Sequence, residues 1–309
     1  MKNIQKFNLD NEKDIHDYFL ENGYVVINNA IPHQTIDEFI YEYEHIKKSP
    51  FFIYYSQSIH ISTRPRLNKY SYIEESMQNA SRLKFFNNFS SKIQNCLYGK
   101  NVSKALSCVT GKEKHISWQN MFFDKSTGTI EHQDSWYLDT QPPGGLVGVW
   151  YALENIHQNS GPFFVFPGSH KMGLIEREKF PDHNDFVTEI QRISNQLNMP
   201  KKAMCLNKGD ILLWHPFLIH GAFQCSDESK SRKSFTSHFY PQGLTAKDTE
   251  KKKLLSIYNH NKPKPTANKD ICLAYRYHDY FYNVLVCFLY IKNKLKTNKL
   301  FSMRREDYS

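Results

Sequence analysis

The chain has 309 residues, enough for one large domain or two small ones with a full hydrophobic core, and its aromatic content of 15% favours a densely packed β interior. Its six cysteines form neither a C-x-x-C pair nor a disulfide-like spacing, and residues 1–6 lack the apolar run of a signal peptide, so we expect a reduced, cytoplasmic protein rather than a secreted one. The formal net charge of +9 is concentrated after residue 243, where 14 Lys and Arg face 6 Asp and Glu, and it therefore concerns binding partners rather than the fold.

The first hundred residues predict a helical layer around one early strand. Apolar residues at helical spacing predict helices over residues 11–21 and 32–48, and an apolar run between them predicts a strand over residues 24–27. Residues 50–72 are irregular and rich in polar and aromatic side chains, and residues 75–98 are expected to be helical.

Three cations lie close together in the irregular segment: Arg64, Arg66 and Lys69. Such a cluster is usually a solvated loop. The other interpretation is a loop over an active-site mouth that binds an anionic substrate.

Short strands separated by turns are predicted from residue 115 onward. Strands are expected over residues 115–123 and 146–154, with Gly-containing and Pro-containing turns between them, and a helical insertion is expected over residues 182–197. Many short strands at this spacing indicate a sandwich or a barrel.

An H-x-D pair, His132 and Asp134, lies between these strands. In an extended segment, residues two apart point to the same face, so an imidazole and a carboxylate can reach one ion. Fe(II) in oxygen-activating enzymes takes two histidines and one carboxylate on one face and keeps other positions open. The best candidate for the third ligand is His220, at the end of an apolar run that predicts a buried strand. His215, in the same run, competes with it.

Arg232 follows His220 by twelve positions, in a segment where polar and large residues partly alternate. A guanidinium that points inward on such a strand needs an anion, and a dicarboxylate suits its two-pronged geometry. The alternative is an exposed strand arginine beside Lys233.

Taken together, the His132-x-Asp134 pair, His220, Arg232 and the Pro-Gly-Ser-His-Lys run at residues 167–171 resemble the phytanoyl-CoA dioxygenase family of Fe(II)/2-oxoglutarate oxygenases. The resemblance implies a mainly β fold with flanking helices (α+β), built on a double-stranded β-helix, or cupin-like jelly roll. It implies Fe(II) held by His132, Asp134 and His220, 2-oxoglutarate paired with Arg232, and O2 as the oxidant of a hydroxylation that yields succinate and CO2. The family has its ligand immediately before a glycine, which favours His220 over His215.

Further site residues are expected, Trp150 from the same resemblance and the others from their positions in the sequence. Ser234, on the face of Arg232, is expected to bind the same carboxylate, and Trp150 is expected to pack against the co-substrate. Gln119 and Met121 are expected to line the pocket. A role as core residues is the alternative for Trp150, Gln119 and Met121, and for Gln119 and Met121 this alternative is favoured. Tyr137 is expected to face the substrate. Because related halogenating enzymes lack the carboxylate, Asp134 favours hydroxylation, and the 167–171 run, with His170, is expected to be structural.

The basic C-terminal part suggests a second unit. We expect an oxygenase domain over residues 1–243 and a basic extension over residues 244–309, with residues 251–253 and 262–265 as solvated linker. Residues 280–291 are apolar and aromatic and precede a basic run, but they are fewer than the ~20 needed to span a bilayer. The extension is expected to hold the enzyme, as a peripheral protein, at the cytoplasmic face of an anionic inner membrane.

The expected substrate is anionic and either small or lipid-linked, for example a sugar acid of lipopolysaccharide, with Arg64, Arg66 and Lys69 binding its charge. Acyl groups on coenzyme A or a carrier protein, and natural products, are the alternative. A non-catalytic jelly-roll binding module is the alternative from another class, but it needs neither the three ligands nor Arg232. The basic extension lacks any nucleic-acid recognition motif, so nucleic acid is not the expected partner.

Overall fold

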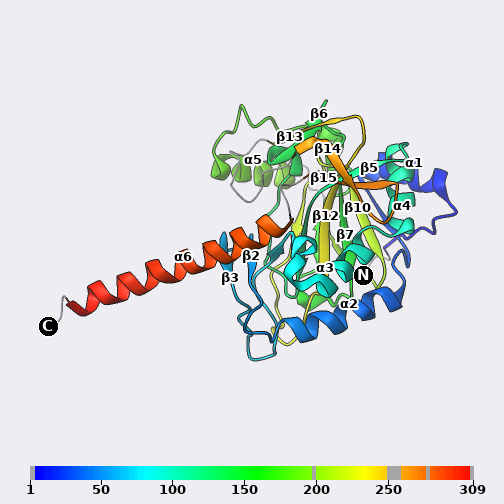
Figure 1. Ribbon diagram of the computed structural model, residues 1–309. Helices are drawn as coiled ribbons and strands as arrows, with labels where there is room; N and C mark the ends of the chain where they lie inside the picture. Colours follow the sequence, from blue (N-terminus) through cyan, green and yellow to red (C-terminus); the bar gives the residue numbers. More distant parts are fainter. Residues whose placement is uncertain (1–3, 197–199, 249–258, 276–278, 307–309) are drawn as a thin grey trace.

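The computed structural model describes residues 4–196, 200–248, 259–275 and 279–306, and its main feature is a large sheet with helices packed against it (Figure 1). The helices are α1 (Glu12–Asn22), α2 (His33–Ile46), α3 (Asn87–Leu97), α4 (Lys100–Thr110), α5 (His183–Gln196) and α6 (Asp279–Glu306). The predicted helices over residues 11–21, 32–48 and 182–197 are confirmed by α1, α2 and α5. Helix α1 ends at Gly23, whose left-handed backbone (φ 74°) lets its N–H bond the carbonyl oxygen of Phe19.

Residues 75–98 do not form one helix, and this prediction was wrong in its first half. Strand β4 (Met77–Gln78) pairs with the neighbouring sheet instead, and two 3-10 turns, η1 (Ala80–Arg82) and η2 (Lys84–Phe86), precede α3. Met77 pairs with Phe122 and Gln78 with Met121. An apolar run this short fits a strand as well as a helix, so the backbone pairing with the sheet decides.

Among the described residues, ten strands form the larger sheet. Their path is β1 (Tyr24–Ile27), β10 (Ile211–Trp214), β7 (Val147–Ala152), β12 (Ser234–Pro241), β5 (His115–Phe123), β4, β2 (Tyr54–Ser56) and β3 (Ile61–Thr63), with β15 (Ile271–Tyr275) on β5 and β14 (Asn259–Pro265) on β15. Smaller sheets are formed by β11 (His220–Ala222), β8 (Phe163–Val165) and β9 (Lys202–Met204), and by β13 (Thr245–Asp248) with β6 (Leu138–Gln141). The predicted mainly β class with flanking helices is confirmed.

Helix α2 packs its apolar face on the larger sheet. Phe39 lies at the centre of this contact, with ring centroids 5.2 Å from Phe122 of β5, 4.8 Å from Phe235 of β12 and 5.9 Å from Phe89 of α3. Aromatic rings at these separations add to the free energy gained from burying their area. This packing fixes β5 and β12, the two strands that carry one wall of the site described below.

We expect Phe39→Ala to lower the free energy of unfolding by about 3–5 kcal/mol, because truncating a buried aromatic removes its contacts and leaves a cavity. Chemical denaturation measures the change. Tyr41→Ala on the same helix is the control, since that side chain is 64% exposed and its removal should change the free energy by no more than about 0.5 kcal/mol. Equal losses for the two variants would contradict the packing.

The expected boundary at residue 243 is not a structural boundary in the described part of the chain. Strand β13 pairs with β6, and β15 runs parallel to β5 inside the larger sheet. Residues 262–265, expected to be linker, belong to β14, whereas residues 251–253 lie outside the described residues. Strand β15 pairs with β5, and β14, whose composition alone looked solvated, pairs with β15.

Residues 280–291, the expected apolar and aromatic segment, lie in α6. This helix starts against the body of the protein and then extends away from it (Figure 1). Among the described residues, no helix combines the length and the apolar character that crossing a membrane requires.

Candidate metal centre and cavity

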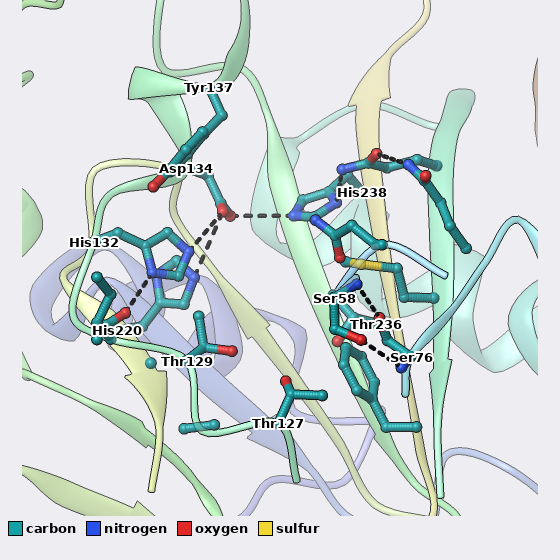
Figure 2. A pocket seen from close by; sticks show the side chains of 18 of the residues that line it. Ser58, Ser76, Thr127, Thr129, His132, Asp134, Tyr137, His220, Thr236 and His238 are labelled. Atoms are coloured by element: carbon teal, nitrogen blue, oxygen red, sulfur yellow. Dashed lines mark hydrogen bonds and ion pairs between the residues drawn. The ribbon is translucent and has the colours of Figure 1, made fainter. Parts of the chain in front are cut away.

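A cavity of about 780 Å³ opens between two walls of the fold (Figure 2). One wall is contributed by β2, β4, β5 and β12, and the other by residues 127–130, the 3-10 turn η3 (Asp134–Trp136) and β11. Figure 2 shows the group of His132, Asp134 and His220 on one side and the hydroxyls of Ser58 and Thr236 on the other. The cavity therefore has one ionisable end and one neutral polar end.

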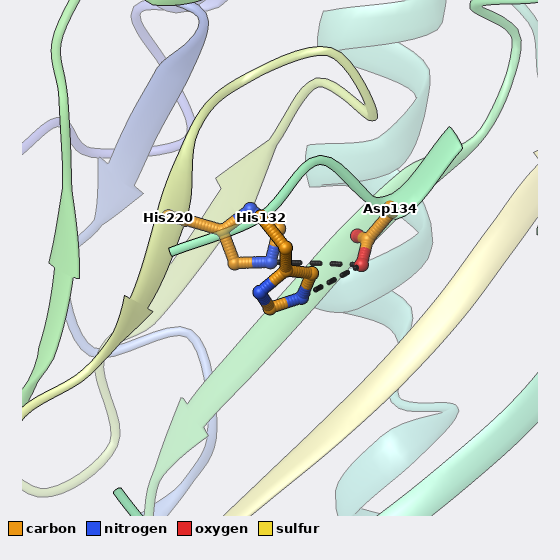
Figure 3. Close-up of side chains that lie close together, drawn as sticks. All are labelled: His132, Asp134 and His220. Carbon is orange, nitrogen blue, oxygen red and sulfur yellow. Dashed lines mark ion pairs between the residues drawn. The ribbon is translucent and has the colours of Figure 1, made fainter. Parts of the chain in front are cut away.

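His132, Asp134 and His220 converge on one point, with one potential ligand atom of each within 4.8 Å of the others (Figure 3). The two histidines form an antiparallel bridge in which each backbone N–H donates to the other residue's carbonyl oxygen, at 3.0 and 3.1 Å. Asp134 begins η3 directly after this bridge. The three predicted residues are thus brought together by the backbone itself.

The strand predicted to end at His220 is interrupted. Strand β10 ends at Trp214, a turn closed by the Leu218 N–H bond to the His215 carbonyl oxygen follows, and His220 begins β11 instead of ending a strand. His215 points elsewhere, because its ring lies against Phe19 and His170. The structure therefore separates the two histidines that competed for the third position.

Both histidines of the group are held in the same tautomer. Nδ1 of His132 lies 2.9 Å from the carbonyl oxygen of Ile130, and Nδ1 of His220 lies 2.9 Å from that of Leu218. A carbonyl oxygen only accepts, so each Nδ1 carries the hydrogen and each Nε2 presents a lone pair. Burial lowers the pKa of His220, which keeps its ring neutral. Imidazoles that present Nε2 lone pairs toward one point are ready to bind a metal ion.

Asp134 divides its two oxygens between different partners. Oδ1 lies 3.6 Å from Nε2 of both His132 and His220, whereas Oδ2 accepts hydrogen bonds from Trp214 Nε1 at 2.8 Å and His238 Nε2 at 3.3 Å. Burial alone would raise the pKa of this carboxyl, but the neighbouring histidines hold the pKa well below its usual range. An ionised oxygen facing two lone pairs favours a cation between them, and this donor set fits Fe(II).

Gln78, Gln119 and His238 form a hydrogen-bonded series of side chains that positions Asp134. His238, which contacts Asp134 directly, was not predicted from the sequence. Gln78 Nε2 donates to Gln119 Oε1 at 3.3 Å, and Gln119 Nε2 lies 3.4 Å from His238 Nδ1, so His238 accepts there and donates from Nε2 to Asp134. Gln119 lines the cavity, although a core role was favoured for it, and it also holds this histidine. The alternation that made Ser234 a candidate continues through Thr236 to His238 and was the available signal.

We expect Trp214→Phe to weaken metal binding by about 10- to 100-fold, because the indole N–H that orients Asp134 is lost while the aromatic packing is kept. Competition with a chromophoric chelator measures the affinity. Trp118→Phe is the control, since Trp118 lines the same cavity and its ring packs against Tyr240, with centroids 6.0 Å apart. An unchanged affinity in Trp214→Phe would contradict the role of this hydrogen bond.

Arg232 lines the cavity and is almost fully buried, with 2% of its surface exposed. Its guanidinium carbon lies 5.2 Å from the ring centre of Phe123 and 5.8 Å from that of Trp150, and its Nε has no hydrogen-bond partner. Burial lowers the pKa of this guanidinium to about 10, so it is still charged at neutral pH. A buried charge with a free donor, facing a cavity, fits an anionic ligand.

The other predicted co-substrate contacts are distributed differently. Tyr137 lines the cavity, as expected, and so does Met121, for which a core role was favoured. Ser234 does not line it, because its hydroxyl donates to the carbonyl oxygen of Arg232 at 3.2 Å, and Thr236 occupies the exposed place on the same face. Trp150 is fully buried behind Arg232, so it supports the guanidinium rather than the ligand.

The expected substrate cations do not line this cavity. Arg64 lies over the ring of Tyr290 in α6, at 5.1 Å, and neither Arg66 nor Lys69 belongs to the lining. The outer part of the cavity presents other basic side chains, Arg177, His183 and His60. His170 lies outside the group as well, with Nε2 3.0 Å from the carbonyl oxygen of Leu20, which agrees with a structural role.

A family profile for phytanoyl-CoA dioxygenase (PhyH) matches residues 19–234, a segment that contains all three converging residues and Arg232. The chain belongs to this family. Among the relatives of the PhyH family, the peroxisomal phytanoyl-CoA dioxygenase of Mus musculus is 26% identical over 231 residues, and that of Homo sapiens is 27% identical over 233 residues. Each match covers 72% of this chain and 66% of the relative, so the chain spans slightly less than two thirds of these proteins.

Solved structures agree with the family at the level of the fold. The epimerase SnoN, in complex with Fe3+, alpha ketoglutarate and nogalamycin RO, superposes with a TM-score of 0.57 at 14% identity over 75% of this chain and 84% of SnoN. The carbocyclase SnoK from nogalamycin biosynthesis gives a TM-score of 0.58 at 14% identity over 78% and 88% of the two chains. EctD from S. alaskensis, with 2-oxoglutarate and 5-hydroxyectoine, gives 0.54 at 15% identity over 73% and 74%. The predicted cupin-like jelly roll is confirmed.

Proposed function

We propose that this PhyH-family protein is an Fe(II)/2-oxoglutarate-dependent dioxygenase that hydroxylates an unactivated C–H bond. The proposal rests on the convergence of two imidazole Nε2 lone pairs and one carboxylate oxygen in a cavity that is also lined by a buried arginine with a free donor. A binding module would require neither feature, and each is costly to bury without a ligand.

Each residue has a distinct task in this proposal. His132, Asp134 and His220 would hold Fe(II), and Arg232 would bind the distal carboxylate of 2-oxoglutarate. The iron, with 2-oxoglutarate and O2, supplies the oxidation and releases succinate and CO2. Trp214 and His238 keep the Asp134 carboxylate oriented, so that one oxygen stays turned toward the histidines.

The aromatic packing on the other side of the group keeps water away from it. Phe163 stacks on the His220 ring with centroids 5.3 Å apart, and Trp214 lies 5.1 Å from the same ring. The retained carboxylate of Asp134 favours hydroxylation over halogenation, because it occupies the place that a halide would need.

The lining of the cavity supports a polar, anionic substrate. Hydroxyls of Ser58, Ser76, Thr127 and Thr129 surround it (Figure 2), and Asp134 is the acidic residue of the described lining. The basic side chains at its outer part favour a negatively charged group. A sugar acid, such as that of lipopolysaccharide, combines hydroxyls with one carboxylate and fits this lining.

Acyl groups on coenzyme A or a carrier protein, and natural products, form the second candidate substrate class. The names of the mouse and human relatives, which are phytanoyl-CoA dioxygenases, favour an acyl-CoA substrate. The similarity to the nogalamycin enzymes favours a natural product. Coenzyme A is itself anionic, so the charge at the cavity mouth suits both classes.

We also propose that the protein works in the cytoplasm, in peripheral contact with an anionic inner-membrane face through residues 244–309. The supporting observations are the charge of these residues and the exposed apolar face of α6.

Succinate formation tests the proposed reaction. Anaerobically loaded protein is exposed to O2 with 2-oxoglutarate and a panel of sugar acids and acyl-CoA thioesters, and succinate is quantified for each. We expect stimulation above the substrate-free rate by at least one anionic compound in wild type and none in Asp134→Ala. No succinate in wild type, with or without substrate, would overturn the assignment.

A further inference from the structure

One face of α6 is fixed on the body of the protein. Tyr282, Asn283 and Val286 are buried, the Tyr282 hydroxyl donates to the carbonyl oxygen of Gln78 at 3.1 Å, and Asn283 Nδ2 donates to that of Arg82 at 2.9 Å. This face contacts β2, β3 and the η1–η2 turns. The helix therefore leaves the body in a defined direction (Figure 1).

The opposite face carries a row of large apolar side chains, each more than half exposed, which we call the α6 stripe: Tyr280, Phe281, Val284, Phe288, Ile291 and Leu295. From Phe281 onward the spacing alternates between three and four positions. At about 3.6 residues per turn and ~1.5 Å per residue, these side chains line one side of the helix over about 20 Å. A contiguous apolar row of this length on a surface marks an interaction site.

The charges beside the α6 stripe indicate the nature of its partner. Exposed lysines border it, Lys292 on one side and Lys294 on the other. Within the described side chains of α6, the acidic residue is Asp279, which is paired with Arg82 at 3.1 Å. A second copy packed stripe to stripe would bring the lysines together, because residues that flank an apolar seam face the partner helix. Negative charge on the partner is therefore favoured.

We propose that the α6 stripe docks onto the surface of an anionic phospholipid bilayer. The apolar side chains enter the boundary between headgroups and acyl chains, while the lysines extend toward the lipid phosphates. The helix lies in the plane of the surface and does not cross it, in agreement with its composition. Salt weakens this contact, because the attraction of lysines to the surface potential is screened.

Docking would also bring the cavity to the lipid surface. Strand β2 and the turn after it line the cavity through Tyr55, Gln57 and Ser58, and both β2 and β3 contact α6. This last step rests on the proposed function: the substrate of the hydroxylase is then an anionic group carried on a lipid and taken from the bilayer surface.

Co-sedimentation with vesicles tests the proposal on the full chain. Phosphatidylcholine vesicles are compared with mixed phosphatidylcholine and phosphatidylglycerol vesicles, at low and high salt. The variants are Phe288→Asp/Ile291→Asp, which breaks the stripe, and Lys292→Glu/Lys294→Glu, which inverts its border. Leu20→Asp is the matched control, because Leu20 is 56% exposed on α1, away from α6 (Figure 1).

We expect wild type and Leu20→Asp to sediment with the anionic vesicles at low salt, and the stripe and lysine variants to bind at least about tenfold more weakly. Equal recovery of wild type and the stripe variant, or no binding by wild type, overturns the proposal. A wild-type dimer in analytical ultracentrifugation that the stripe variant dissociates, without vesicle binding, also overturns it and assigns the stripe to a second copy. Vesicle binding needs neither iron nor 2-oxoglutarate, so it succeeds or fails independently of the proposed reaction.

Discussion

His220→Ala should abolish the weak visible absorption band that Fe(II) and 2-oxoglutarate form together on the protein in the absence of O2. The wild type presents two Nε2 lone pairs and one ionised oxygen to the ion, and the variant loses one of the two imidazoles. Because loss of an outer hydrogen bond already costs about 10- to 100-fold in metal affinity, loss of a ligand should cost at least about 100-fold. Anaerobic titration of the apoprotein, followed by absorbance, measures the effect.

His215→Ala is the matched control for this titration. It removes a buried histidine of the same segment, whose pKa burial lowers to about 4 and whose Nδ1 accepts the Phe217 N–H at 3.1 Å. We expect this variant to keep the band, because its ring lies against Phe19 and not in the cavity. A band that survives in His220→Ala and disappears in His215→Ala would reverse the assignment of the third ligand. Absence of the band in wild type would remove the basis of the oxygenase proposal.

Arg232→Met should have two effects of opposite sign. The affinity for 2-oxoglutarate should fall by about 100-fold, because a charge-assisted, two-pronged contact with a carboxylate is lost. The free energy of unfolding of the unliganded protein should rise by about 1–2 kcal/mol, because a buried charge whose Nε lacks a partner is replaced by an apolar side chain of similar length. Titration with 2-oxoglutarate and chemical denaturation without ligand measure the two quantities.

Lys233→Met separates these effects from a general loss of charge. Lys233 is the adjacent cation, but its Nζ lies 3.4 Å from Asp124 Oδ1 and 3.8 Å from Glu154 Oε2. Removing it leaves the buried Asp124 carboxylate without its cationic partner, so we expect a loss of about 3 kcal/mol in stability and little change in 2-oxoglutarate affinity. If Arg232→Met lowers the free energy of unfolding as much as Lys233→Met does, the Arg232 guanidinium belongs to a structural ion pair and does not bind a ligand.

The residues that carry chemistry could be found from the sequence because their types and order are unusual. His132, Asp134, His220 and Arg232 combine side chains that are costly to bury, and the structure brings the first three together and buries the fourth behind the same cavity. The partners that orient them could not be found in the same way. Trp214 and His238 reach Asp134 from strands far away in the sequence, and only tertiary structure brings them there.

The errors in the fold have a common physical cause. Residues 77–78, expected to be helical, and residues 262–265, expected to be linker, became strands because an open edge of the sheet was available to pair with. Local composition contains no information on such an edge. The cluster of Arg64, Arg66 and Lys69 was assigned to the substrate for its charge, whereas the cavity is lined by other basic side chains, among them Arg177, His183 and Arg232.

The unequal use of the two Asp134 oxygens has a consequence for the choice among metals in the cell. With Oδ2 engaged by an indole and an imidazole, the carboxylate offers a single oxygen to any ion. Ca2+ seeks six to eight oxygens and Mg2+ a nearly complete oxygen octahedron, often with several waters. A site with two nitrogen ligands and one oxygen ligand therefore binds both Ca2+ and Mg2+ weakly. The abundant alkaline-earth ions are thus rejected by the donor set itself, and competition for the site is confined to the scarcer transition metals, which accept imidazole.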